Sequence, residues 1–172
     1  MAIAITPFDG LCGFRPLKET AHFLRTIPAL RKLVGEEKVN NFDSTVKDHE
    51  TSGDEKTMDM NKKALRDCFA ALMNADKDAI TSAAKDLVSS AKDNPESFAE
   101  GGGPRPDSGK ELAELVIRLD GQFPGDIGLF VLFFLNYVKL APGEAMFLRA
   151  DDIHAYLSGG ESHDYLLYGR GY

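Results

Sequence analysis

The chain has 172 residues and a formal net charge of −7 at pH 7. This length allows one domain, or one domain and part of another, with a core of useful size. The acidic balance argues against a nucleic-acid-binding surface. Cys12 and Cys68 lack the spacing of a zinc motif and are expected to be free thiols in a reducing compartment. The N-terminus lacks the basic and long apolar regions of a signal peptide, so a cytoplasmic location is expected.

The N-terminal segment is expected to be extended. Met1–Ile5 is an apolar run that ends at Thr6-Pro7, and it predicts a strand with partners on both faces. The glycine-punctuated segment Phe8–Phe14 predicts a turn and a short extended piece.

From Pro16 to Phe123 the spacing of apolar residues predicts a series of amphipathic helices. Pro16 stands at a permitted first-turn position, and Gly35 is a suitable residue after a helix end. Loops are expected over His49–Asp59 and Phe98–Gly109. The expected helices are one that starts at Pro16, then Ala29–Val34, Glu36–Lys47, Asn61–Met73, Ala79–Ala91 and Lys110–Phe123.

The last three of these helices each have an apolar face that the sequence defines residue by residue. In Asn61–Met73 this face includes Cys68 as a packing residue and Phe69 as a buried aromatic. The apolar positions expected inside are Ala64, Leu65, Cys68, Phe69, Leu72, Met73, then Ile80, Ala83, Ala84, Leu87, Val88, and finally Leu112, Leu115, Val116 and Leu119.

The stretch from Phe123 to Gly160 mixes helix and strand signals. Asp126 is a plausible helix cap, and the apolar run Ile127–Val138 predicts a buried core helix that is too short to span a bilayer. A tight turn around Pro142 and Gly143 is followed by a segment, Ala145–Leu148, that predicts a buried strand.

The next segment predicts a strand that carries a histidine. After a polar turn at Asp151-Asp152, Ile153–Leu157 alternates apolar residues with His154 and Tyr156, which places both on one polar face. A histidine in this position can be a metal ligand or can bind a neighbouring carbonyl for structural reasons. The pattern leaves both roles open.

Several segments together resemble the type I mannose-6-phosphate isomerases, also called phosphomannose isomerases. They are MAIA, TPF and GLCGFRP near the start, then PGDIG, FLNYVKL, PGEAMFL and HAYLSG. The resemblance implies a zinc enzyme with a cupin jelly-roll catalytic domain, an inserted helical domain and a second jelly roll. It implies that His154 is a zinc ligand and that Tyr156 lines the active site.

The same resemblance implies an activity and its setting. Enzymes of this family interconvert mannose 6-phosphate and fructose 6-phosphate by moving a proton between C1 and C2 through an enediol. They are cytoplasmic, they supply mannose donors through GDP-mannose biosynthesis, and they are expected to be monomeric. The expected partner is therefore a sugar phosphate, with no nucleic acid and no membrane.

The predicted fold class is α+β, a helical insertion domain attached to a partial cupin-type jelly-roll β-barrel. Residues 1–15 are expected to be the end of a catalytic barrel segment and residues 16–123 the helical domain. Residues 124–160 are expected to return into the barrel with His154, and residues 161–172 to form a divergent tail.

Two departures from the family pattern bear on activity. The family's other zinc ligands, from a Gln-x-His pair and a His-Lys-Pro-Glu segment, precede the MAIA segment at which this sequence begins. The tail lacks the family's substrate-binding arginine motif. The chain is therefore expected to be an internal fragment that holds no zinc and is inactive alone. The alternative is a non-catalytic helical interaction module derived from the enzyme.

Overall fold

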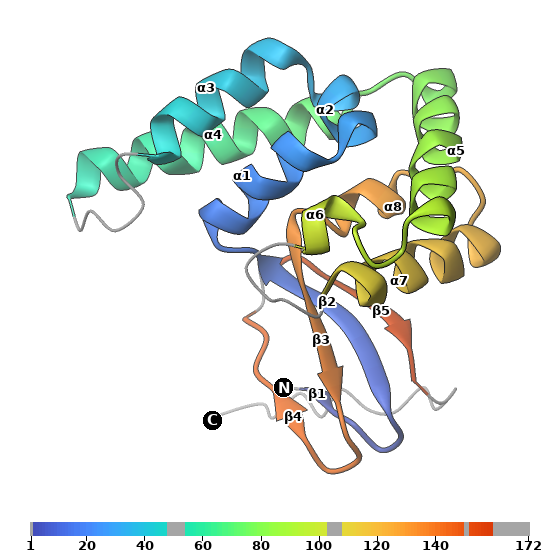
Figure 1. Cartoon of the computed structure of the whole chain (residues 1–172). Coiled ribbons are helices and arrows are strands. Elements are labelled where there is room, and N and C mark those ends of the chain that lie inside the picture. The colour runs from blue at the N-terminus through green and yellow to red at the C-terminus, as the bar shows by residue number, and fades with distance from the viewer. Residues whose placement is uncertain (1, 48–53, 103–107, 150–151, 160–172) are drawn as a thin grey trace. The chain divides into compact units, whose positions relative to one another are not determined.

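The computed structural model describes residues 2–47, 54–102, 108–149 and 152–159. The chain divides into two compact units, one formed by residues 1–14 with 135–172 and the other by residues 15–134. The second unit is helical and is inserted, along the chain, between the two parts of the first (Figure 1).

The helical unit contains the predicted helices, some with different ends, and also a short helix at Ala99–Gly102, where the sequence predicts a loop. Within it α3 packs on α1 and α4, and α5 packs on α2 and α7. Its described helices are α1 (Leu17–Thr26), α2 (Pro28–Val34), α3 (Glu36–Lys47), α4 (Glu55–Met73), α5 (Lys77–Asp93), α6 (Ala99–Gly102), α7 (Ser108–Gln122) and α8 (Gly128–Val131).

Local capping explains where several of these helices begin and end. Asp76 accepts hydrogen bonds from the amides of Asp78 and Ala79, at 2.9 and 3.2 Å, and so starts α5. Gly35 ends α2 with a φ of 93°, a conformation that favours glycine. Asp54 accepts from the amide of Thr57 at 3.1 Å, so α4 begins at Glu55. The predicted loop was therefore wrong for residues 55–59, and its part from 49 to 53 lies outside the described residues.

The core of the helical unit is aromatic at its centre. Phe133 contacts Phe23 and Phe98, with ring centroids 5.4 and 6.4 Å apart. The predicted inward positions of α5 and α7 are all buried. On α4 the prediction was wrong for Met73, which is 49% exposed, and Phe69 is only half-buried. The fully buried aromatic side chains in the described part of the chain are Phe23, Phe42, Phe130, Phe133 and Phe134.

The predicted core helix over Ile127–Val138 was wrong in its second half. The run forms the short helix α8 and then, after a turn, the strand β3 (Leu135–Leu140). Asp126 does act near the helix start, because its carboxylate accepts from the amide of Gly128 at 2.7 Å. The backbone amides and carbonyls of β3 pair with those of β2. Because this pairing satisfies them, the run does not need the internal hydrogen bonds of a helix.

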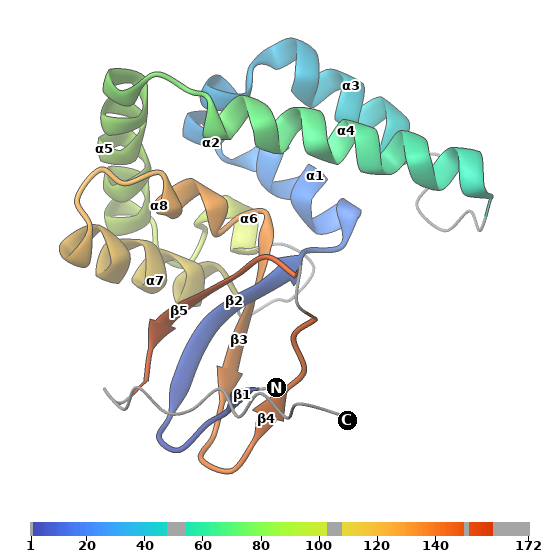
Figure 2. The same ribbon diagram turned by 180° about the vertical axis from the view of Figure 1, so that it is seen from behind.

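The other unit is built on a small antiparallel sheet (Figure 2). Strand β2 (Phe8–Phe14) is central, between β3 and β5 (His154–Ser158), so the two ends of the described chain meet in one sheet. A separate two-stranded ladder joins β1 (Ala2–Ile3) to β4 (Ala145–Met146). The α+β class is confirmed, and the described strands form an open sheet of three strands.

Two local predictions for this unit need correction. Phe8–Phe14 is a continuous strand of seven residues with an irregularity between Cys12 and Phe14. The predicted buried strand Ala145–Leu148 is shorter, and it is not buried, because Ala145 is exposed and Phe147 is 76% exposed. The side chains stay open because β4 pairs only with the two-residue strand β1 among the described strands.

Candidate functional site

The two residues predicted to be functional lie side by side on β5. His154 stands opposite Cys12 and Tyr156 opposite Gly10 on β2. Since alternate residues of a strand share a face, both side chains lie on the same face of the sheet. Their ring centroids are 5.7 Å apart, and both side chains are exposed. The predicted placement of His154 and Tyr156 on one face of a strand is confirmed, whereas their functional roles stay predictions.

Gly10 allows an aromatic contact that supports Tyr156. A Cβ at position 10 would come within 2.9 Å of the Phe8 ring and 3.2 Å of the Ala155 carbonyl oxygen. With glycine at that position, Phe8 meets Tyr156 edge to face, with ring centroids 5.4 Å apart. This arrangement is a favourable one for two aromatic rings.

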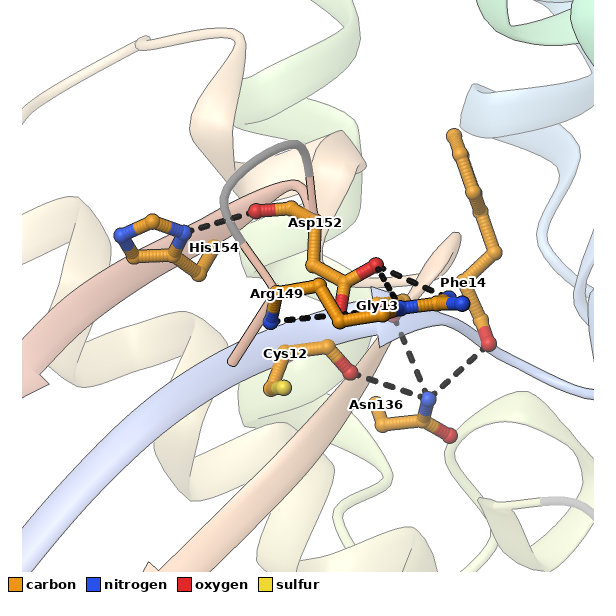
Figure 3. A network of polar contacts seen from close by, with 7 residues as sticks. All are labelled: Cys12, Gly13, Phe14, Asn136, Arg149, Asp152 and His154. Carbon is orange, nitrogen blue, oxygen red and sulfur yellow. Dashed lines mark hydrogen bonds and ion pairs between the residues drawn. The ribbon is translucent and has the colours of Figure 1, made fainter. Parts of the chain in front are cut away.

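The His154 ring is held through one nitrogen. Its Nδ1 lies 2.7 Å from the carbonyl oxygen of Asp152 (Figure 3). A carbonyl oxygen only accepts hydrogen bonds, so Nδ1 carries the hydrogen and donates it. In the neutral imidazole the lone pair then lies on Nε2, which is the tautomer of a histidine that binds a metal through Nε2.

Asp152 is itself fixed by Arg149. The Asp152 carboxylate accepts from the Arg149 amide at 3.0 Å and forms an ion pair with its guanidinium at 3.1 Å. These contacts lower the pKa of the Asp152 carboxyl from its ordinary value, because the hydrogen bonds from the Arg149 side chain and amide stabilise its charged form. The residue that supplies the carbonyl for His154 is thus anchored by its own side chain.

A bulge in β2 links this region to β3. Gly13 has a φ of +62° and lies where the register shifts between Cys12 and Phe14. Its amide donates to the carbonyl of Ile153, next to His154, at 2.9 Å. The Nδ2 of Asn136, on β3, donates to the carbonyls of Cys12, Gly13 and Phe14 at 3.0, 3.2 and 2.9 Å (Figure 3).

Sequence reasoning did not single out Asn136, Gly13 or the carbonyl of Asp152. The signal that could have found Asn136 is its polarity inside the otherwise apolar run Ile127–Val138. A polar side chain in such a run needs hydrogen-bond partners, and the backbone of the β2 bulge supplies them.

Cys12 lies between Asn136 and His154 in one row across the sheet. Burial raises the pKa of its thiol above the ordinary value, and the negative charge of Asp152 raises it further. A thiol in this environment stays protonated at neutral pH, which argues against a reactive nucleophile at this position.

The described residues do not by themselves form a zinc site. A zinc site needs three or four nitrogen, oxygen or sulfur ligands. No group of three or more His, Cys, Asp or Glu side chains gathers for a metal among the described residues. His154 fits the role of one ligand, but the residues described here do not complete the set.

None of the described helices is long and apolar enough to cross a membrane.

Comparison with known proteins places these features in a family. The family model described as "Phosphomannose isomerase type I, helical insertion domain" matches residues 33–135, more than half of the chain. The mannose-6-phosphate isomerase of Aspergillus fumigatus is 54% identical over 162 residues, which cover 92% of this chain and 35% of that protein. The Saccharomyces cerevisiae enzyme of the same name is 45% identical over 160 residues, with the same coverage. The chain thus spans about a third of the length of the curated relatives that it matches.

The solved structures agree with this. Mannose 6-phosphate isomerase from Salmonella typhimurium, bound to its substrate fructose 6-phosphate and to zinc, matches with a TM-score of 0.59 and 26% identity. The match covers 91% of this chain and 32% of that one. By its sequence, its helical unit and its small antiparallel sheet, the chain belongs to the type I phosphomannose isomerase family.

Proposed function

We propose that this chain is part of a mannose-6-phosphate isomerase, a zinc-dependent enzyme that interconverts mannose 6-phosphate and fructose 6-phosphate. The relatives with that name match the chain across 92% of its length at up to 54% identity. The observation that carries the proposal is the state of His154. Its Nδ1 binds the Asp152 carbonyl at 2.7 Å, which leaves Nε2 for a metal on the face that also carries Tyr156.

His154 and Tyr156 have different roles in this proposal. His154 would hold zinc through Nε2, and the zinc, when bound, would polarise the oxygens of the sugar. Tyr156 is 58% exposed beside His154, so its ring and hydroxyl are available to contact a sugar phosphate. Phe8 keeps the Tyr156 ring in place by its edge-to-face contact. The other zinc ligands would come from outside the described residues.

We also propose that the sheet unit is part of a cupin-type jelly roll. In the described sheet, β3 and β5 are edge strands, and barrel closure would require partners beyond them. Large apolar side chains of this unit are also exposed, among them Ile3 at 58%, Ile5 at 65% and Phe147 at 76%. Further barrel strands would cover such side chains. A cytoplasmic location and a role in mannose-donor supply belong to the same proposal.

A segment exchange tests the function. Residues 2–159 replace the matching segment of the A. fumigatus enzyme, and the purified chimera is assayed for zinc content and for isomerisation of mannose 6-phosphate. The expected result is a zinc-loaded, active enzyme, because the segments are 54% identical. The same chimera with His154→Ala should lose zinc and activity together, whereas Asn74→Ala, on the helical unit, should keep both.

Two outcomes would overturn the proposal. One is a folded chimera that binds no zinc and has no activity. The other is a His154→Ala chimera that retains its zinc, which would make His154 a structural residue. The alternative of a non-catalytic helical interaction module would then be the better hypothesis.

The 172-residue chain by itself is expected to contain no stoichiometric zinc and to show no isomerase activity. One imidazole cannot hold zinc firmly, and His154 is the ligand that the described residues offer. Metal analysis of the purified chain checks this expectation. Tightly bound zinc at one per chain, removed by His154→Ala, would mean that other residues of this chain complete a site.

A further inference from the structure

We propose that Asn136 is a positioning residue for the His154 imidazole. It lies on β3, on the far side of β2 from His154, and is linked to it through the β2 bulge. The role of the positioned ring as a metal ligand rests on the proposed function, but the positioning itself can be tested without metal.

The first step is the bond between Asn136 and the bulge. Consecutive carbonyls of a regular strand point to opposite sides, so one side chain cannot normally reach three of them. The left-handed conformation of Gly13, with a φ of +62°, changes this direction locally. The Asn136 amide then reaches the carbonyls of Cys12, Gly13 and Phe14, all within 3.2 Å. Asn136 therefore stabilises the bulge against a return to regular pairing.

The second step is the bond between the bulge and β5. The amide of Gly13 donates to the carbonyl of Ile153 at 2.9 Å, and Cys12 pairs with His154. This contact fixes the backbone between Asp152 and His154. The Cys12 carbonyl, which the Asn136 amide binds, and the Gly13 amide belong to one peptide group, so Asn136 holds the peptide that anchors the start of β5.

The third step is the bond that orients the ring. His154 Nδ1 donates to the Asp152 carbonyl two residues earlier, at 2.7 Å. The geometry of this short loop depends on the backbone at Ile153, which the bulge holds. Asn136 thus acts through Gly13 and Ile153 on the tautomer and direction of the ring, as outer residues commonly do for histidine ligands.

Nuclear magnetic resonance of the metal-free 172-residue chain tests this. Long-range proton–nitrogen spectra at alkaline pH, where imidazoles are neutral, report which ring nitrogen carries the hydrogen. His154→Gln identifies the His154 signal among the four histidines. The expected result is the Nδ1–H tautomer for His154. His22 serves as an internal reference with the opposite tautomer, because its Nε2 lies 2.8 Å from the Ala99 carbonyl oxygen.

Asn136→Ala is expected to reduce the ratio of the Nδ1–H to the Nε2–H tautomer of His154 by roughly three- to tenfold, the equivalent of one net hydrogen bond. The His22 signal should not change. The amide of Gly13 should exchange faster with solvent. A purely structural role would lower the unfolding midpoint of Asn136→Ala but leave the His154 tautomer of the folded chain as it is.

A second variant keeps the test decisive if Asn136→Ala does not fold. Gly13→Ala has room, since the nearest heavy atom to the added Cβ is Asn136 Nδ2 at 3.9 Å, but it disfavours the positive φ of the bulge. It should shift the His154 tautomer in the same direction. Asn74→Ala is the matched control, because Asn74 also donates to a carbonyl, that of Ala70 at 2.7 Å, but in the helical unit.

The proposal is overturned if folded Asn136→Ala or Gly13→Ala keeps the wild-type tautomer ratio of His154, or if Asn74→Ala changes that ratio equally. Its failure is distinct from failure of the proposed function. The tautomer is measured without zinc or substrate, whereas the function is tested by the zinc content and activity of the chimera.

Discussion

At the scale of single residues, burial decides the chemical behaviour of Cys68. Its side chain is fully buried on α4, and its thiol lies 3.5 Å from the Lys38 carbonyl oxygen. Burial raises the pKa of this thiol to about 12, with a smaller contribution from Asp67 that Lys38 partly offsets. The sequence-based interpretation of Cys68 as a packing residue is confirmed by its burial.

The Cys68 thiol is expected to make stability depend on alkaline pH. In the unfolded chain the thiol has its ordinary pKa of 9.0, so above that pH unfolding releases its proton. Its contribution to the free energy of unfolding is full below pH 9.0 and is lost as the pH rises toward the folded-state value of about 12. The slope is at most about 1.4 kcal/mol per pH unit.

Urea denaturation of the wild type and of Cys68→Ala at a series of pH values checks this. The difference in unfolding free energy between them should be constant below the ordinary thiol pKa and should shrink above it. Parallel pH profiles for the two proteins would contradict the expectation.

The buried hydroxyl of Thr20, on α1, is expected to contribute nothing favourable to the stability of the fold. Its side chain is 1% exposed, and its Oγ1 has no hydrogen-bond partner in the described part of the chain. A buried hydroxyl without a partner costs free energy, so Thr20→Val should raise the free energy of unfolding by about 1 kcal/mol.

Thr26→Val is the matched control, because the Thr26 hydroxyl donates to the His22 carbonyl at 2.9 Å. That variant should be less stable than the wild type or equal to it. Thermal and urea unfolding of the two variants give the comparison, and a destabilised Thr20→Val would show that its hydroxyl is satisfied in solution.

At the scale of elements, α4 shows how the end of a helix departs from its apolar pattern. The pattern predicts that Phe69 and Met73 share the buried face with Cys68 and Leu72. Cys68 and Leu72 are fully buried, but Met73, which is the last residue of α4, is 49% exposed. Phe69 packs edge to face against Phe134, with 5.4 Å between the ring centroids.

Phe69→Ala is therefore expected to cost about 2 kcal/mol of unfolding free energy, less than the roughly 3–5 kcal/mol of a fully buried phenylalanine. Met73→Ala, on the same helix, should change stability by less than about 0.5 kcal/mol. Urea denaturation measures both. Equal effects for the two variants would mean that the Phe69–Phe134 contact does not form in solution.

At the scale of the whole molecule, the helical unit has its own core. Among the described residues, the fully buried aromatics, from Phe23 to Phe134, lie within residues 15–134. The two ends of this unit also meet, because the amide of Arg15 donates to the carbonyl of Phe134 at 2.8 Å. A unit with its own core and adjacent ends can be excised without cutting an element.

Residues 15–134 alone are thus expected to fold. Far-ultraviolet circular dichroism of this segment should show a dominant helical signal, and the signal should be lost in one cooperative thermal transition. Leu72→Ala should lower the midpoint of that transition, because Leu72 is fully buried within the unit. A gradual, non-cooperative loss of helix would show that the sheet unit is needed for the core.

The sequence by itself determined the helices that depend on local signals. The bounds of α3 were predicted correctly, and those of α2 and α5 within two residues at each end, because a helix closes its own hydrogen bonds and its caps lie next to it in the chain. The motif around His154 was also sufficient to name that residue as a candidate ligand. These features need no information from distant parts of the chain.

Only the tertiary structure decided the fate of the run Ile127–Val138 and the surroundings of His154. An apolar run without alternation fits a buried helix or a buried strand equally, and the partner of β3 is β2, near the other end of the chain. Asn136 reaches the Cys12 carbonyl across a sequence separation of 124 residues. Such contacts form because the backbone amides and carbonyls of the sheet must pair. Which strand pairs with which, and in which register, cannot be predicted from either segment alone.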